Sequence, residues 1–170
     1  MFEYLCKTPS DINEHLPNLR DLASECDSVI EMGVRYCVST WAFIEGLRPG
    51  THLVSIDIKH PSKYNGDLVA VEKACKNKGI KFKFVEADTT QITVEEADMI
   101  FIDTLHEYGQ LKKELELHGN KARKYLVFHD TVSCEEELMP AINEFLKVNK
   151  HWKVKEHWTF NNGVMVLERC

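Results

Sequence analysis

Short apolar runs alternate with amphipathic segments along most of the chain, and this alternation constrains the fold more than any other feature of the sequence. The runs have the length of strands, and the segments between them have the apolar spacing of helices. Such alternation is typical of a mostly parallel sheet that is covered by helices on both faces. The predicted parallel strands are Ser28–Met32, His52–Ile58, Lys81–Glu86, Met99–Ile102 and Tyr125–Phe128.

Capping residues and helical spacing predict five helices between and after these strands. They are Ser10–Cys26, Ser39–Leu47, Asp67–Lys78, Tyr108–His118 and Cys134–Val148. Near the end of the chain, Asn161-Asn162-Gly163 separates two further strands, Trp152–Phe160 and Val164–Leu167, and is typical of a tight hairpin turn. We therefore expect an α/β three-layer sandwich with a mostly parallel seven-stranded sheet and an antiparallel C-terminal hairpin.

The length of 170 residues suits one domain. We expect residues 1–170 to form it, with a helical segment, residues 1–27, packed on the core. The net charge is −6 and the chain has no basic run, so we expect no nucleic-acid partner. Its longest apolar stretches are strand-sized and no signal peptide is evident, so we predict a cytoplasmic protein without membrane contact. Six cysteines without a C-x-x-C pair are predicted to be reduced thiols.

Polar and acidic residues stand at the ends of the predicted parallel strands. In open α/β sheets, ligands bind beyond the carboxyl ends of the strands, so the repetition indicates a binding site. The residues at these ends are Glu31-Met32-Gly33, Asp57, Asp88, Asp103 and His129-Asp130.

The chemistry of several of these residues suits a nucleoside ligand. Gly33 lets the backbone turn sharply beside a ligand, and the next helix offers free N–H groups near Ser39 and Thr40. Asp57, 24 residues beyond Gly33, can accept hydrogen bonds from the hydroxyls of a ribose. Asp88 can bind the amine of an adenine. A tight turn at Gly33 and capping by the two aspartates are the alternative interpretations.

The strand-end motifs resemble those of a known enzyme family. The segments Glu31-Met-Gly33-Val-Arg-Tyr-Cys-Val-Ser39-Thr40, Ser55-Ile-Asp57 and Glu86-Ala-Asp88 resemble the first three binding motifs of class I S-adenosylmethionine-dependent methyltransferases. Two further segments, Phe101-Ile-Asp103-Thr-Leu-His106-Glu-Tyr108 and Leu126-Val-Phe-His129-Asp130-Thr131, are similar to metal-dependent O-methyltransferases, particularly those that modify macrolide sugars and cephalosporins. The resemblance spans roughly residues 29–167.

The resemblance implies a Rossmann-like fold and a role for each matching residue. The implied cofactor-binding residues, for S-adenosylmethionine (SAM), are Glu31, Gly33, Ser39, Thr40, Asp57, Ile58, Asp88 and Thr89. Asp103 and Asp130 would bind Mg²⁺ or Mn²⁺, with His129 as a further metal ligand. His106, together with Asp103, would be catalytic, with His106 as the general base that takes the proton of a hydroxyl.

Two positions, Cys37 and His129, depart from the family pattern. Cys37 stands where the family usually has glycine, and His129 stands where it tends to have an acidic metal ligand, so His129 is also compatible with a structural role. His106 could likewise cap a helix or lie on the surface.

We expect the segment Lys112–Glu116 to be a solvated helix face. The other histidines are predicted to lie on the surface: His15, His52, His60, His118, His151 and His157.

The sequence therefore favours a cation-assisted O-methyltransferase that acts on a hydroxyl of a sugar, either a small molecule or a glycan. The short chain has little spare length for a lid over the substrate, so we expect an open site. Such a site is compatible with a homo-oligomer in which a second subunit completes it. A non-catalytic binding module with the same fold is the first alternative. An NAD-dependent oxidoreductase is the second, but the turn that begins at Gly33 lacks the G-x-G-x-x-G pattern.

Overall fold

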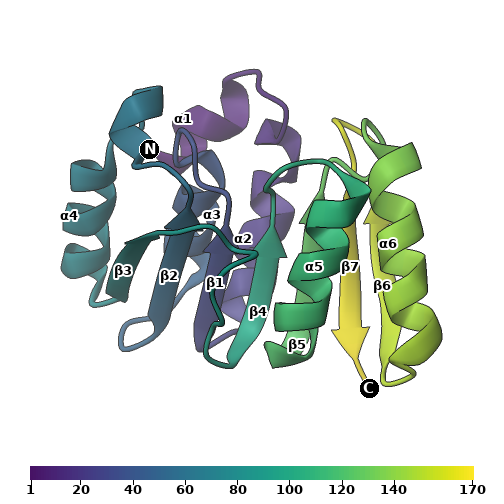
Figure 1. Cartoon of the computed structure of the whole chain (residues 1–170). Coiled ribbons are helices and arrows are strands. Elements are labelled where there is room, and N and C mark those ends of the chain that lie inside the picture. The colour runs from purple at the N-terminus through teal and green to yellow at the C-terminus, as the bar shows by residue number, and fades with distance from the viewer.

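Seven strands form one sheet in the order β3-β2-β1-β4-β5-β7-β6 in the computed structural model, which describes all 170 residues (Figure 1). Strands β1 to β5 are parallel, and β7 runs antiparallel to both β5 and β6. This confirms the predicted sheet and its C-terminal hairpin. The strands are β1 Ser28–Met32, β2 His52–Asp57, β3 Lys81–Glu86, β4 Ala97–Ile102, β5 Ala122–His129, β6 Trp152–Trp158 and β7 Val164–Arg169.

Six α-helices and three short 3-10 helices accompany the sheet. The α-helices are α1 Phe2–Lys7, α2 Leu16–Ser24, α3 Val38–Gly46, α4 Leu68–Lys78, α5 Tyr108–His118 and α6 Glu135–Val148. The 3-10 helices are η1 Asn13–His15, η2 Pro61–Tyr64 and η3 Gly119–Lys121. None of the helices is both long enough and apolar enough to cross a membrane.

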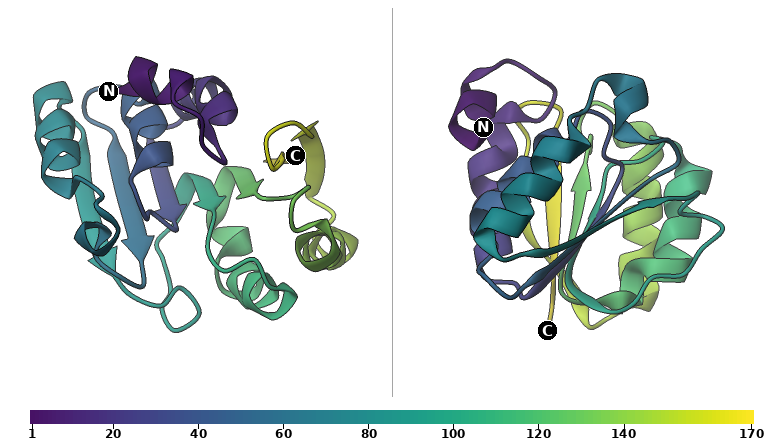
Figure 2. Two further views of the ribbon diagram at one scale, coloured as in Figure 1. Left: turned by 90° about the horizontal axis from the view of Figure 1, so that it is seen from above. Right: turned by 90° about the vertical axis from the view of Figure 1, so that its left-hand side faces the viewer.

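Helices cover both faces of the sheet and make three layers (Figure 2). A hydrophobic core lies on each face of the sheet. Helices α1 to α4 contribute to one core, and α5 and α6 contribute to the other. Successive strand residues point to opposite faces. In β4, Met99 and Phe101 therefore belong to the first core, while Ile100 and Ile102 belong to the second. All four side chains are buried, which explains the unbroken apolar run in the sequence.

The N-terminal segment differs from the single helix predicted over residues 10–26. Helix α2 begins only at Leu16, with Pro17 in its first turn. Residues 8–12 form a loop that leads into η1, and the Asn13 side chain accepts a hydrogen bond from the backbone N–H of Ser10 in this loop. This loop lies at the end of the sheet toward which the parallel strands point, the upper end in Figure 1.

Two of the six histidines predicted to lie on the surface, His15 and His118, are fully buried, so the prediction was wrong for them. Nε2 of His15 lies 2.9 and 2.8 Å from the carbonyl oxygens of Phe160 and Asn161. Nε2 of His118 lies 2.8 Å from the carbonyl oxygen of Thr89. Burial lowers the pKa of both rings, so each is neutral and donates from Nε2. Hydrogen bonds to carbonyl groups that are distant in the sequence therefore compensate for the burial of these polar rings.

Candidate active site

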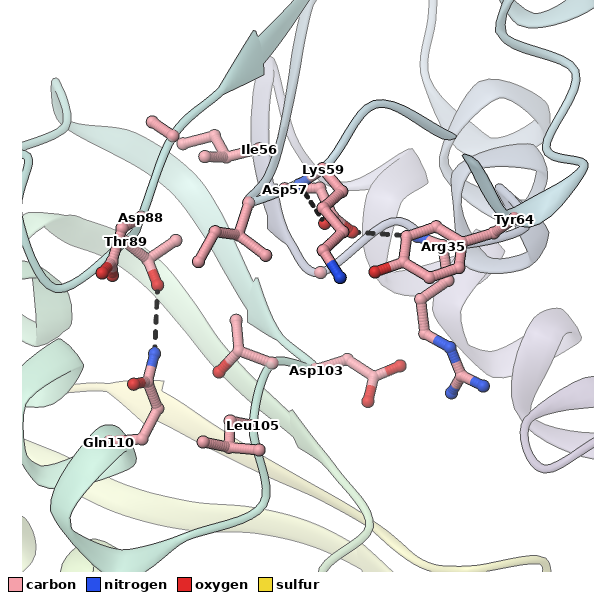
Figure 3. Close-up of a pocket in the computed structure, with 14 residues that line it drawn as sticks. Arg35, Ile56, Asp57, Lys59, Tyr64, Asp88, Thr89, Asp103, Leu105 and Gln110 are labelled. Atoms are coloured by element: carbon pink, nitrogen blue, oxygen red, sulfur yellow. Dashed lines mark hydrogen bonds between the residues drawn. The ribbon is translucent and has the colours of Figure 1, made fainter. Parts of the chain in front are cut away.

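The carboxyl ends of the parallel strands line a cavity of about 430 Å³. Strands β1 and β4 are neighbours at its centre, where the order of the strands reverses, as expected for a ligand site in such a sheet. Six predicted site residues line it, and Figure 3 shows several of them: Gly33, Asp57, Ile58, Asp88, Thr89 and Asp103. The structure therefore brings together residues from four separate strand ends.

Gly33 brings the end of β1 into contact with the end of β4. Its φ is +88°, and a Cβ atom at this position would lie 1.9 Å from the carbonyl oxygen of Asp103. The N–H of Gly33 donates to the carbonyl of Ile56, and the N–H of Asp103 donates to the carbonyl of Met32. Only glycine fits here, because any side chain would separate the two strand ends.

Asp57 fixes the loop that follows β1. Its Oδ2 accepts hydrogen bonds from the backbone N–H groups of Val34 and Arg35, at 2.8 and 3.0 Å. Its Oδ1 accepts one from the N–H of Lys59 at 2.9 Å. A carboxylate has about four acceptor positions, so one is left for a ligand. Asp57 is thus both a wall of the cavity and a brace for the loop beside it.

The loop after β1 contains Cys37 in a conformation that favours glycine. Its φ is +62°, and it is buried immediately before α3. Burial raises the pKa of its thiol to about 12, so the thiol is protonated and unreactive at neutral pH. All six cysteines are free.

Three predicted cofactor residues, Glu31, Ser39 and Thr40, do not line the cavity but form a buried network behind its wall. The Glu31 carboxylate accepts hydrogen bonds from the hydroxyls of Ser39 at 2.6 Å, Thr40 at 2.9 and 3.0 Å, and Ser55 at 2.5 Å. Burial raises the pKa of Glu31 to about 7, although the hydroxyl donors oppose the shift. The network joins the start of α3 to β1 and β2.

Two large apolar side chains line the same cavity while being unusually exposed. Ile58, just after β2, is 61% exposed, and Leu105, just after β4, is 57% exposed. Such side chains in a largely formed cavity favour an apolar or aromatic ligand group. The sequence analysis included Ile58 but missed Leu105, because a single leucine in a loop carries no distinctive pattern.

Glu114, on α5, is the second residue that the sequence analysis missed. It is completely buried, so the solvated face predicted for Lys112–Glu116 was wrong for this residue, whereas Lys112, Lys113 and Glu116 are exposed. Its carboxylate accepts hydrogen bonds from the hydroxyls of Thr89 and Thr104 and from the Gln110 side chain. Glu114 therefore ties the loops after β3 and β4 to one helix, and all three of its partners line the cavity.

Asp103 also belongs to a cluster of acids and histidines beside the cavity. Candidate metal-ligand atoms of Asp103, His129 and Asp130 lie within 4.8 Å of one another. Nδ1 of His129 lies 3.2 Å from Oδ1 of Asp103 and 3.0 Å from Oδ2 of Asp130. Nε2 of His106 lies 3.3 Å and 2.9 Å from the same two oxygens. The structure thus brings all four predicted catalytic and metal-binding residues together.

The charges in this cluster shift one another's pKa values. Burial raises the pKa of Asp103 and Asp130, but hydrogen bonds to His106 and His129 outweigh it and hold both below the ordinary value. Hydrogen bonds to Asp103 and Asp130 raise the pKa of His106 to about 10. Burial opposes the charge on His129, but the same two carboxylates still raise its pKa to about 10. The two adjacent carboxylates therefore stabilise a positive charge beside them, here on the two histidine rings.

Residues from both ends of the chain orient the cluster. Nε2 of His129 lies 2.9 Å from the carbonyl oxygen of Asp11, in the N-terminal loop. Oδ1 of Asp130 accepts hydrogen bonds from the Ser133 hydroxyl at 2.5 Å and from the Asn162 side chain at 2.8 Å. With Nε2 directed at the Asp11 carbonyl, Nδ1 is the ring atom that faces the two carboxylates, and it would bind a cation there after losing its proton.

The donor set fits a divalent cation. Two carboxylates suit Mg²⁺ and Mn²⁺, and an imidazole makes Mn²⁺ or another transition metal more favourable. The contacts of Asp11, Ser133 and Asn162 hold the ligand side chains from behind, as is usual around bound metals.

No family model matches the sequence, and neither does any curated protein. Solved structures do match. An O-methyltransferase from Bacillus cereus in complex with SAH has 15% sequence identity and a TM-score of 0.67, with 92% of this chain and 81% of that chain covered. The chain has the fold of an O-methyltransferase. A putative caffeoyl-CoA O-methyltransferase from Staphylococcus aureus has 14% identity and a TM-score of 0.66, covering 99% and 89% of the two chains. The O-methyltransferase TomG from Streptomyces achromogenes, in complex with SAM, has 13% identity and a TM-score of 0.60, with 95% of this chain and 81% of that chain covered.

Proposed function

We propose that this protein is a SAM-dependent O-methyltransferase that uses a divalent cation, Mg²⁺ or Mn²⁺, and methylates a hydroxyl of a sugar or glycan. The observation that carries the proposal is that the nucleoside-sized cavity and the acidic cluster share Asp103. A donor in the cavity and an acceptor hydroxyl at the cluster would therefore meet at one residue. The likeness to the three solved methyltransferases agrees with this arrangement.

The residues that line the cavity suit the parts of SAM. Ile58 and Leu105 provide apolar contacts for an adenine ring, with Asp88 and Thr89 beside them. Asp57 offers its remaining acceptor position to the ribose, and Gly33 allows the ligand to approach the backbone. In this proposal Glu31, Ser39 and Thr40 act from behind the wall, by holding the loop and helix that follow β1.

In the proposed reaction, Asp103, Asp130 and His129 would hold the cation, which would supply the positive charge that orients the acceptor hydroxyl and lowers its pKa. SAM supplies the methyl group. The acceptor oxygen forms a bond to the methyl carbon as the carbon–sulfur bond breaks, and the electron pair of that bond stays on sulfur. His106 would take the hydroxyl proton. Without a cation its Nε2 pairs with Asp103 at 3.3 Å and Asp130 at 2.9 Å and is held protonated, and a cation bound by these carboxylates would replace that positive charge and free Nε2 to act as a base.

A sugar or glycan acceptor is supported by the resemblance of the Asp103-x-x-His106 segment to sugar methyltransferases and by the shape of the surface. A hollow of about 430 Å³ opens beside His106 and is lined by residues 132–137 at the start of α6. It can admit the end of a bulky acceptor. A second subunit that completes this hollow is part of the proposal, and the molar mass in solution checks it.

Calorimetric titration with S-adenosylhomocysteine (SAH), the demethylated form of SAM, tests the cofactor assignment. We expect micromolar binding by the wild type and at least about a tenfold loss in Asp57→Ala, which removes a ribose acceptor. Binding of Mn²⁺, followed separately, should be lost in Asp130→Asn while SAH binding is retained. Absence of SAH binding under all metal conditions would favour a non-catalytic module, and selective binding of NAD would favour an oxidoreductase.

If SAH binds, sugars and glycans are then screened for transfer of the methyl group by mass spectrometry, with and without EDTA. Methylation that EDTA abolishes and Mn²⁺ or Mg²⁺ restores is the expected result. Methylation that persists in EDTA would overturn the cation part of the proposal, and methylation of other hydroxyl compounds alone would overturn the sugar assignment.

A further inference from the structure

One end of the cavity is cationic, although the protein as a whole is acidic. Arg35, Lys59 and Tyr64 line this end, while Asp88, Thr89 and Gln110 line the opposite end (Figure 3). Asp103 lies between the two groups. The cavity therefore has a direction, from an end lined by Asp88, Thr89 and Gln110, past Asp103, to a cationic end.

The backbone of Arg35 is held firmly in place. Its N–H donates to Oδ2 of Asp57, and its φ is +41°. Its carbonyl is packed closely against Gly66, where a Cβ atom would lie 2.6 Å from the Arg35 oxygen. The origin of the Arg35 side chain is therefore fixed relative to the cavity before any ligand binds.

The guanidinium group itself has only weak partners. Its side chain is 51% exposed, and its one ion pair is with Asp11 at 3.6 Å, also about half exposed. It also lies 5.3 Å from the centre of the Tyr36 ring. Exposed ion pairs of this kind contribute little to stability, so exchanging Asp11 for a ligand carboxylate costs little.

A guanidinium at this position opposes binding of a cation and favours an anion. If an adenine occupies the end lined by Asp88 and Thr89 and the methyl group lies near Asp103, the rest of a SAM molecule extends toward Arg35. The only anionic group of SAM is the carboxylate of its methionine part. We propose that Arg35 binds this carboxylate and thereby selects cofactors that carry it. This inference rests on the proposed function.

The test compares SAM with decarboxylated SAM, which lacks only the carboxylate, on wild type and Arg35→Met. For the wild type we expect SAM to bind at least about tenfold more tightly than decarboxylated SAM, as for a charge-assisted hydrogen bond. In Arg35→Met the affinity for SAM should fall by the same factor and the preference should disappear. Arg35→Lys, which keeps the charge but not the planar fork, should retain part of the preference.

Arg48→Met is the matched control, because it makes the same charge change at a residue that pairs with Asp27 at the opposite end of the sheet. It should leave both affinities within about twofold of wild type. Thermal unfolding of each variant checks that it is folded. Arg35→Met retaining the full preference for SAM would overturn the inference and show that Arg35 serves an anionic acceptor or the protein itself.

Two further outcomes separate this inference from the proposed function. If SAM does not bind to the wild type, both the proposed function and this inference are overturned. If Asp11→Asn lowers SAM affinity as much as Arg35→Met does, Arg35 acts by tethering the N-terminal loop, and only the inference is overturned.

Discussion

The carbonyl oxygen of Asp103 lies where a side chain at Gly33 would have to be, with 1.9 Å between that oxygen and an added Cβ atom. The contact joins the end of β1 to the end of β4 at the centre of the cavity. Because Asp103 also belongs to the acidic cluster, the position of Gly33 decides how the cavity and the cluster meet.

Gly33→Ala should therefore destabilise the protein by at least about 2 kcal/mol, through the clash and the positive φ together. Gly50→Ala is the control, because Gly50 has φ +89° with nothing within 4 Å of an added Cβ. It should cost only about 1 kcal/mol. Urea unfolding of both variants measures the difference. Equal losses would mean that the strand ends can move apart freely.

Glu31→Gln should change how stability depends on pH. The pKa of Glu31 is raised from 4.5 to about 7 in the folded protein, so the folded state holds a proton that the unfolded state releases between these values. This contribution is fully present below pH 4.5 and is lost as pH rises through about 7. At about 1.4 kcal/mol per pKa unit, the loss amounts to about 3 kcal/mol.

The check is the free energy of unfolding of wild type and Glu31→Gln, measured in urea from pH 4 to pH 8. The wild type should lose stability relative to the variant as pH rises across this interval, because glutamine does not titrate. Parallel curves for the two proteins would contradict the pKa shift of Glu31.

Glu114→Gln should weaken SAH binding about tenfold, because an amide cannot accept all the hydrogen bonds that Thr89, Thr104 and Gln110 donate. The loops after β3 and β4 would then be less firmly placed. In turnover, KM for SAM should rise while kcat at saturation changes little.

Asp98→Asn is the control for Glu114→Gln. Asp98 is also buried, but it binds the N–H of Asp27 and the Arg123 guanidinium at the opposite end of the sheet. It should lower thermal stability without changing SAH affinity. If both variants lose stability and neither loses affinity, Glu114 is only structural.

His106→Ala should reduce methyl transfer by about a hundredfold or more, the ordinary contribution of a general base. SAH affinity should change by less than about twofold, because His106 does not line the cofactor cavity. Single-turnover assays and calorimetry on the same preparation measure the two quantities. Unchanged turnover would remove the assignment of His106 as the base.

The sequence by itself determined the sheet and the edge of the sheet at which the structure has its cavity. Apolar runs, one alternating segment and the hairpin turn at residues 161–163 together predicted all seven strands. The polar residues after the parallel strands predicted the edge where the cavity lies, because the carboxyl ends of parallel strands meet at one edge. Periodicity and turn chemistry are local properties, so one chain is enough to read them. The sequence alone likewise shows that an acidic residue follows a strand, because this requires no knowledge of the contacts of its side chain.

Only the tertiary structure decided which polar residues are buried and which face the cavity. His15, His118 and Glu114 are buried because partners from distant segments satisfy their hydrogen bonds. The cost of burying a polar group depends on those partners, and the sequence around it does not name them. The same holds for Arg35: its place at the cationic end follows from hydrogen bonding to Asp57 and packing against Gly66, neither of which is a neighbour in sequence.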